Sequence, residues 1–239
     1  MAATSILLAG FGGQGVLFAG KFLAYKGMVQ GKQLSWLPSY GPEMRGGTAN
    51  CSVILSDTPV GSPIITNPDV LVAMNLPSLQ KFVNTVVPGG KIILDSTLID
   101  AKVERDDVEV FYVPATQLAK DNGFASLSNM ILTGKVLKEI DIVSFEGNRE
   151  TLEPFIPAKK AGLIDMNLQA LQIGCDYRFL PSQTCLPHRG RWPGAAGSEG
   201  VCLRCWDTPP VSFADSPLPE GAKMFVLSDI PLKGSVFHA

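Results

Sequence analysis

A glycine-rich segment near the amino terminus is the first candidate for chemistry. Residues 10–15 read GFGGQG, which matches the pattern G-x-G-x-x-G. The pattern lies between a short apolar run, Thr4–Ala9, and a segment whose apolar residues recur at helical spacing. Glycines at such a turn let backbone N–H groups approach a phosphate, with the positive end of the helix behind them. The alternative is that the glycines only allow the helix to pack on the strand or dock against another protein. The residues that we expect to bind a cofactor here are Gly12, Gly13, Gln14 and Gly15.

A second loop, residues 39–48 (SYGPEMRGGT), combines glycines with an aromatic hydroxyl, a carboxylate and a guanidinium. Arg45 suits bidentate contact with a phosphate or a carboxylate. The loop follows the second expected strand, so it should emerge at the same edge of a sheet as the glycine loop, where both could bind one anion. We expect Tyr40, Arg45 and Gly46 to contribute to this site. The alternative is a structural turn in which Glu43 and Arg45 pair with neighbours.

A site for NAD needs a carboxylate at the end of the second strand, about 20 residues after the glycine loop, to bind the ribose. That strand is expected over Gln33–Leu37 and should end at Pro38. No Asp or Glu occurs between Met1 and Pro42. A stand-alone NAD-dependent dehydrogenase is therefore disfavoured, although the glycine pattern keeps it as an alternative.

Histidine is missing from most of the chain. His188 and His238 both lie in the last quarter, and residues 1–179 contain none. Mechanisms that use a Ser-His or Cys-His pair are thus excluded from this part, and we assign no catalytic residue. Cys51 falls in an expected strand and is predicted to be an inert buried thiol.

The order of the expected elements predicts an α/β fold. Short apolar runs alternate with helical patterns, which is typical of a Rossmann-like, mostly parallel sheet with helices on both faces. Asn75 and Asn129 precede two of the helices and are interpreted as their caps. The expected strands are Thr4–Ala9, Gln33–Leu37, Thr48–Leu55, Val70–Met74, Lys91–Leu94 and Val108–Val113. The expected helices are Gly13–Gln30, Leu76–Val86, Ala115–Asp121, Met130–Glu139, Arg149–Phe155 and Leu163–Ile173.

The composition changes near Phe179, which divides residues 1–179 from a loop-rich extension over residues 180–239. The extension holds eight of the chain's 18 prolines and shows little periodicity. Two pairs, Cys185-x-x-His188 and Cys202-x-x-Cys205, have the spacing of a tetrahedral zinc site, although chance spacing in an irregular segment is the alternative.

Overall composition excludes several classes of protein. The 239 residues are 46% hydrophobic and 18% charged, so the chain can bury a core. The net charge of −2 and the absence of a basic run argue against nucleic acid or an anionic membrane surface as a partner. No apolar stretch is long enough to span a membrane, and the amino terminus lacks the features of a signal peptide. Together with the sparse cysteines, this predicts a cytoplasmic protein.

The two loops resemble those of a known family. The GFGGQG loop followed by residues 39–57 (SYGPEMRGGTANCSVILSD) is similar to the gamma subunit of 2-oxoacid:ferredoxin oxidoreductases, and among these most similar to the 2-oxoglutarate enzyme. Gamma-type subunits of the pyruvate, branched-chain and indolepyruvate enzymes are the alternatives. The resemblance covers residues 1 to about 179 and leaves the extension without a counterpart. It continues through Ser62-Pro63, Asn67–Leu71, Pro88–Gly90, Asn167 and Ala170.

This resemblance implies a role in a complex that oxidatively decarboxylates a 2-oxo acid with coenzyme A, forming acyl-CoA and CO2 and passing electrons to ferredoxin. In the family, thiamine diphosphate lies between the alpha and beta subunits, and iron–sulfur clusters lie in the beta or delta components. The gamma module packs beside them and helps to shape the coenzyme A site. Residues 1–179 carry no cysteine set for a cluster, so we expect a subunit that is inactive alone.

Overall fold

The computed structural model describes residues 3–40, 48–157 and 160–178. Its elements alternate between strands and helices in the order that the apolar pattern predicts, ending with a group of helices. They are β1 (Ala3–Phe11), α1 (Val16–Val29), β2 (Gln33–Tyr40), β3 (Thr48–Ser56), β4 (Val70–Ala73), α2 (Leu76–Phe82), the 3-10 helix η1 (Val83–Thr85), β5 (Lys91–Asp95), β6 (Glu109–Val113), α3 (Ala115–Asp121), α4 (Ser128–Glu139), α5 (Asn148–Leu152), the 3-10 helix η2 (Glu153–Phe155) and α6 (Gly162–Asp176).

The strands form one sheet in the order β2-β3-β1-β4-β5-β6. β1, β4, β5 and β6 are parallel, which confirms the mostly parallel α/β fold. β3 runs antiparallel to both β1 and β2. A parallel neighbour would require a crossover of a dozen residues or more, whereas only residues 41–47 separate β2 from β3. β3 therefore returns directly along β2, and it separates β2 from β1.

Several expected boundaries were wrong, among them the start of the first helix, which begins at Val16 and not at Gly13. β2 does not end at Pro38 but continues to Tyr40, with Pro38 opposite Cys51 of β3. β2 is the edge of the sheet, where a proline can replace an N–H without breaking a ladder on both sides. The expected helix Leu76–Val86 also ends earlier, because α2 gives way to a 3-10 turn after Phe82.

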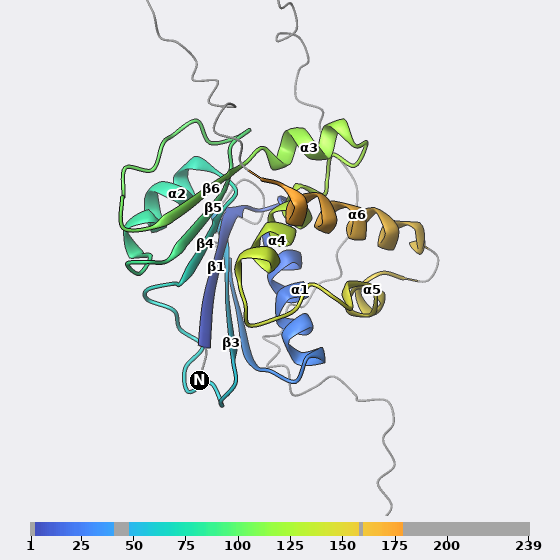
Figure 1. Ribbon diagram of the computed structural model, residues 1–239, viewed down its shortest axis with the longest axis horizontal. Coiled ribbons are helices and arrows are strands. Elements are labelled where there is room, and N and C mark those ends of the chain that lie inside the picture. Colours follow the sequence, from blue (N-terminus) through green and yellow to red (C-terminus); the bar gives the residue numbers. More distant parts are fainter. Residues whose placement is uncertain (1–2, 41–47, 158–159, 179–239) are drawn as a thin grey trace, which may run out of the picture. The chain divides into compact units, whose positions relative to one another are not determined.

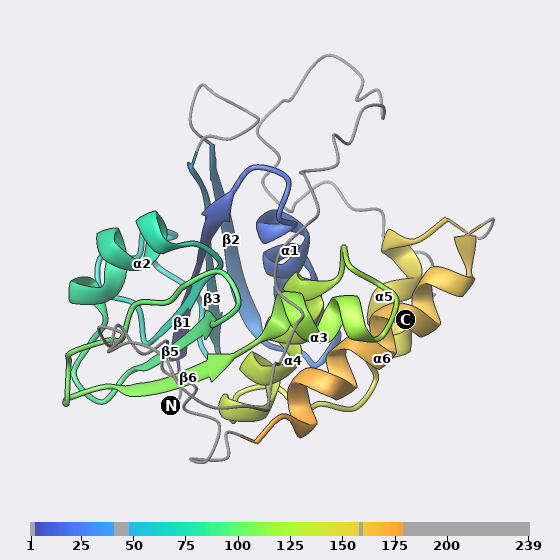
Figure 2. The same cartoon turned by 90° about the horizontal axis from the view of Figure 1, so that it is seen from above.

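Helices cover both faces of the sheet, as Figures 1 and 2 show, with α2 on one side and α1, α4 and α6 on the other. β1 illustrates the reason. Ile6 and Leu8 pack in the core beneath α1 and α4, while Leu7 between them packs in the second core beside α2. Successive side chains of a strand point to opposite faces, so a central strand covered on both sides reads as a continuous apolar run.

None of the helices in the described part of the chain is both long and apolar enough to cross a membrane. Cys51 is fully buried between β3 and α1, and burial raises the pKa of its thiol to about 12. The prediction of an inert thiol at this position is therefore supported, because the reactive species is the thiolate.

Candidate functional site

The glycine loop joins the carboxyl end of β1 to the amino end of α1. Gly13 and Gly15 have φ of 100° and 76°, a region that residues with a side chain rarely adopt. Gly15 is the N-cap of α1, and its carbonyl accepts the first helical bond from the Ala19 N–H at 3.0 Å. No described side chain caps this helix, and its first turn carries no acidic residue. Among the residues with assigned positions, the positive end of α1 is thus left without a negative partner.

Helix α3, which follows β6, shows how this chain satisfies a helix end with its own residues. Asp95, at the end of β5, is 1% exposed and accepts hydrogen bonds from the Thr116 N–H at 3.1 Å and the Thr116 hydroxyl at 2.5 Å. It also accepts the Thr97 N–H at 3.0 Å. A carboxylate therefore already occupies the amino end of α3. Among the described helices, α1 and α4 both begin without a side-chain cap or an acidic residue in the first turn, and α1 is the one that follows the glycine loop.

The second predicted loop begins beside the glycine loop. Phe11, the last residue of β1, pairs with Thr48 of β3, and Tyr40, the last residue of β2, pairs with Ala49. The register therefore places both ends of the β2–β3 connection at the edge of the sheet where the glycine loop emerges. Arg45 and Gly46 lie outside the described residues, as does the side chain of Tyr40. Their approach to the anion stays a prediction.

Asn129 was wrongly interpreted as a helix cap. α4 begins at Ser128, so Asn129 lies inside its first turn, and the N-cap position belongs to Leu127. The Asn129 amide instead donates to the Gly15 carbonyl at 3.2 Å, across from α4 to the glycine loop. Its Oδ1 is buried and has no hydrogen-bond partner in the described structure. A Cβ at Gly15 would lie 2.5 Å from the Asn129 Nδ2, so this position accepts only glycine.

Asn75 is confirmed as the cap of α2, because its Oδ1 accepts the Ser78 N–H at 2.8 Å. Its Nδ2 is buried and has no partner among the described residues. Asn75 follows β4, the neighbour of β1, so it lies at the same edge as the glycine loop. A buried polar atom without a hydrogen bond is costly. The described residues hold three more such atoms, in Trp36, Asn148 and Asn167, so the position of Asn75 and Asn129 at the edge of the glycine loop is what makes them candidates for contact with a ligand.

Asn75 and Asn129 could not be recognised from the sequence as members of the candidate site. Their local signals are those of helix caps, which the type of residue and its position before a helix explain fully for Asn75. Only the packing of α4 against the glycine loop reveals the contact of Asn129 with Gly15. Asn129 and Gly15 are 114 residues apart in the chain, so their contact leaves no local pattern in the sequence.

Among the described residues, the groups placed at this edge are the amino end of α1 and the amides of Asn75 and Asn129, which form hydrogen bonds and are neither acids nor bases. In the ranges with assigned positions, no three His, Cys, Asp or Glu residues are grouped to hold a metal ion. The zinc pairs formed by Cys185, His188, Cys202 and Cys205 lie outside those ranges, so that site stays a prediction that metal analysis of the purified chain can test.

The geometry also differs from that of a dinucleotide site. In a dinucleotide-binding βαβ unit, the strands on either side of the first helix are neighbours, and the ribose carboxylate ends the second. Here β3 lies between β1 and β2. The missing carboxylate and this inserted strand both disfavour NAD.

The fold is thus an α/β module with a glycine loop at the carboxyl end of a parallel strand, the edge of the sheet where ligands bind in folds of this class. Residues 5–177 match the model of the pyruvate ferredoxin/flavodoxin oxidoreductase family. The chain belongs to this family, which confirms the resemblance stated from the two loops.

Relatives in this family differ in length. The ketoisovalerate oxidoreductase subunit VorA of Methanothermobacter thermautotrophicus is 43% identical over 176 residues, which are 72% of this chain and 36% of VorA. The chain thus spans about a third of that relative. The 2-oxoglutarate synthase subunit KorC of the same organism is 34% identical over 71% of this chain and 92% of KorC. The keto/oxoacid ferredoxin oxidoreductase gamma subunit of Geobacter sulfurreducens is 28% identical with a TM-score of 0.64, over 73% of this chain and 95% of the other.

Proposed function

We propose that this chain is the gamma subunit of a 2-oxoacid:ferredoxin oxidoreductase complex. The complex converts a 2-oxo acid, coenzyme A and oxidised ferredoxin into acyl-CoA, CO2 and reduced ferredoxin, with two electrons leaving the substrate. The observation that carries the proposal is the match to 92% of KorC and 95% of the Geobacter gamma subunit, which are whole chains of this kind. The partners are alpha and beta subunits, with a delta subunit in some assemblies. Thiamine diphosphate and iron–sulfur clusters belong to those partners.

The role of this chain is to bind the phosphates of coenzyme A at a site shared with the partners. The open amino end of α1 and the Nδ2 of Asn75 supply hydrogen-bond donors, which suit phosphate oxygens. The Oδ1 of Asn129 is an acceptor and suits an N–H or O–H of the same ligand. These groups therefore fit coenzyme A, an anion that also carries amide and hydroxyl donors. Binding the remote part of coenzyme A would orient its thiol at the reacting carbon.

Two 2-oxo acids are candidates for the substrate of the complex. The two loops predict 2-oxoglutarate, and the 34% identity to KorC supports this acid. The 43% identity to VorA favours a branched-chain 2-oxo acid as the second candidate. The reconstituted complex, assayed with 2-oxoglutarate and with ketoisovalerate, decides between them by the ratio of kcat/KM values. If the complex turns over neither acid to a measurable extent, both assignments are contradicted.

Purification tests the proposed assembly directly. We expect the tagged chain, isolated from its native source, to co-elute with a thiamine-binding subunit and an iron–sulfur subunit. The isolated chain should neither turn over a 2-oxo acid nor bind NADH. Turnover by the isolated chain would refute the role of a non-catalytic subunit.

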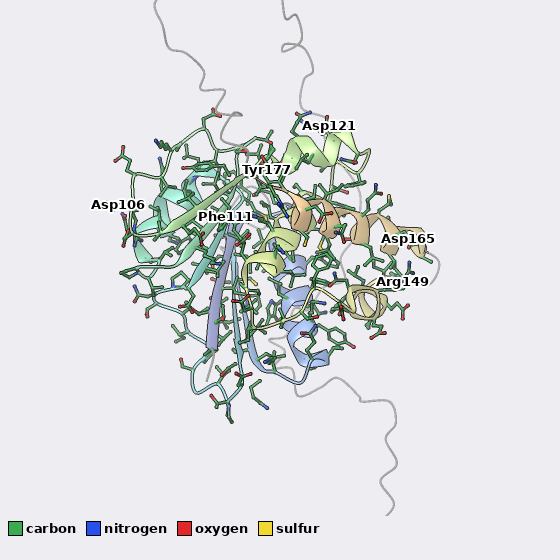
Figure 3. The ribbon with its side chains drawn as sticks, viewed as in Figure 1. Asp106, Phe111, Asp121, Arg149, Asp165 and Tyr177 are labelled. Atoms are coloured by element: carbon green, nitrogen blue, oxygen red, sulfur yellow. The ribbon has the colours of Figure 1, made fainter. Side chains whose placement is uncertain are left out.

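Replacing Arg45 by alanine in the reconstituted complex should raise the apparent KM for coenzyme A by about tenfold, because a charge-assisted hydrogen bond is worth about 1.5–3 kcal/mol. Decarboxylation that depends only on thiamine diphosphate should be nearly unchanged. Arg149→Ala is the matched control, since Arg149 is an exposed arginine of α5 that pairs with Asp165 of α6 (Figure 3). An unchanged requirement for coenzyme A in the Arg45 variant would leave the second loop with an interface role.

A further inference from the structure

Gln14 is the residue of the glycine loop whose side-chain oxygen and nitrogen each make a hydrogen bond within the chain. Its Oε1 accepts the Phe11 N–H at 2.6 Å, and its Nε2 donates to the Met74 carbonyl at 3.0 Å. Both partners are backbone groups of fixed polarity, so the orientation of the carboxamide is determined. The backbone of Gln14 also closes the turn, because its N–H donates to the Phe11 carbonyl at 3.2 Å. The side chain therefore bridges the loop after β1 and the loop after β4.

Gly10 provides the space for this bridge. A Cβ at Gly10 would lie 2.6 Å from the Gln14 Oε1 and 3.0 Å from the Met74 Cβ. The first glycine of the pattern thus allows the carboxamide to fold back across the end of β1. Gly10 and Gln14 therefore share a structural role in this packing, and that role does not require contact with a ligand.

The Gln14 side chain connects two parts of the candidate site, the amino end of α1 and the loop that contains Asn75. On one side it holds the turn that leads to Gly15 and the amino end of α1. On the other side it holds Met74, the residue directly before Asn75, whose Nδ2 has no partner in the described part. Without the carboxamide, the Phe11 N–H and the Met74 carbonyl would lose these hydrogen bonds, and the Met74 N–H would still donate to the Ala9 carbonyl at 2.9 Å. The glycine loop beyond Phe11 would then be held less firmly against Met74.

We propose that Gln14 is a positioning residue of the coenzyme A site rather than a ligand of it. It acts by holding the glycine loop and the Asn75 loop at the spacing that lets both meet one phosphate group. This inference rests on the proposed function. It also revises the expectation that the Gln14 side chain binds the cofactor directly.

The chain contains a matched control at the other end of α1. The Gln30 Oε1 accepts the Ser144 N–H at 2.8 Å, and its Nε2 donates to the Ser144 carbonyl at 3.1 Å. Gln30 therefore ties a helix end to a loop with the same two kinds of bond, and it lies far from the glycine loop along the helix. Gln14→Leu and Gln30→Leu remove equivalent interactions, and only the first should affect coenzyme A.

The experiment compares these two variants in the reconstituted complex. Gln14→Leu should raise the apparent KM for coenzyme A about fivefold or more, with a smaller change in kcat, because two hydrogen bonds that hold the loop are lost. Hydrogen exchange of the Phe11 amide should also become faster in this variant, whereas Gln30→Leu should change neither quantity. An unchanged KM with faster exchange at Phe11 would overturn the positioning role.

Gly15→Ala separates failure of this inference from failure of the proposed site. Its control is Gly31→Ala, since Gly31 has a similar φ of 74° but no atom near the added Cβ. If Gly15→Ala raises the KM for coenzyme A and Gln14→Leu does not, the site stands and the positioning role fails. If neither variant changes it, the glycine loop does not bind coenzyme A and both proposals fail.

Discussion

Gly134→Ala and Gly174→Ala should each reduce the free energy of unfolding by about 3 kcal/mol or more. The two glycines form the contact between α4 and α6. A Cβ on Gly134 would overlap the Leu171 carbonyl oxygen of α6, and a Cβ on Gly174 would overlap the Ile131 carbonyl oxygen of α4. Both obstructions are backbone atoms, so no side-chain rotation can relieve them, and the helices would have to separate.

Denaturant unfolding of the purified chain measures this effect, and Gly162→Ala is the control. Gly162 is the exposed first residue of the same helix α6, and its added Cβ would meet no atom within 4 Å. This substitution should be neutral or slightly stabilising, because alanine is the better helix former. A loss of less than about 1 kcal/mol at both Gly134 and Gly174 would show that the helices are not packed backbone against backbone.

Lys26 should make the free energy of unfolding increase with pH between about pH 8 and pH 10.5, and the buried Cys51 thiol should oppose this increase above about pH 9, because its pKa is raised from 9.0 to about 12. Lys26 is 0% exposed on α1, and its Nζ donates to the Glu146 carbonyl at 2.6 Å. Burial lowers the pKa of this ammonium from 10.5 to about 8. In that window the unfolded chain binds a proton that the folded chain has released, so unfolding becomes less favourable as the pH increases. The difference corresponds to about 3 kcal/mol as an upper value.

Lys26→Met removes this ammonium and leaves Cys51 in place, so the free energy of unfolding of the unsubstituted chain, relative to that of the variant, should rise between pH 8 and pH 10. Urea unfolding at several pH values measures the difference between the two chains. Lys21→Met, which removes an exposed ammonium from the same helix, should keep the behaviour of the unsubstituted chain. A Lys26→Met variant with the same pH dependence as the unsubstituted chain would show that the buried amine does not titrate in this range.

The candidate site was only partly predictable. The glycine loop, its place between a strand and a helix, and the shared edge with the second loop all follow from patterns within about 45 residues. Asn75 could be identified as a cap because its partner, the Ser78 N–H, is three residues away. The bridge from Gln14 to Met74 and the bond from Asn129 to Gly15 join residues 60 and 114 positions apart, and no local pattern records them.

The sequence alone determined the class of fold, the order of the elements and the family. These properties depend on apolar periodicity and on loop residues that are close together in the chain. Such local patterns can be read directly from the sequence. The tertiary structure decided the antiparallel direction of β3, the continuation of β2 through Pro38, the glycine contact between α4 and α6, and the unpartnered amide atoms beside α1. Each of these depends on which elements meet across the fold, because direction, close approach and the satisfaction of a buried polar group are properties of the packed chain.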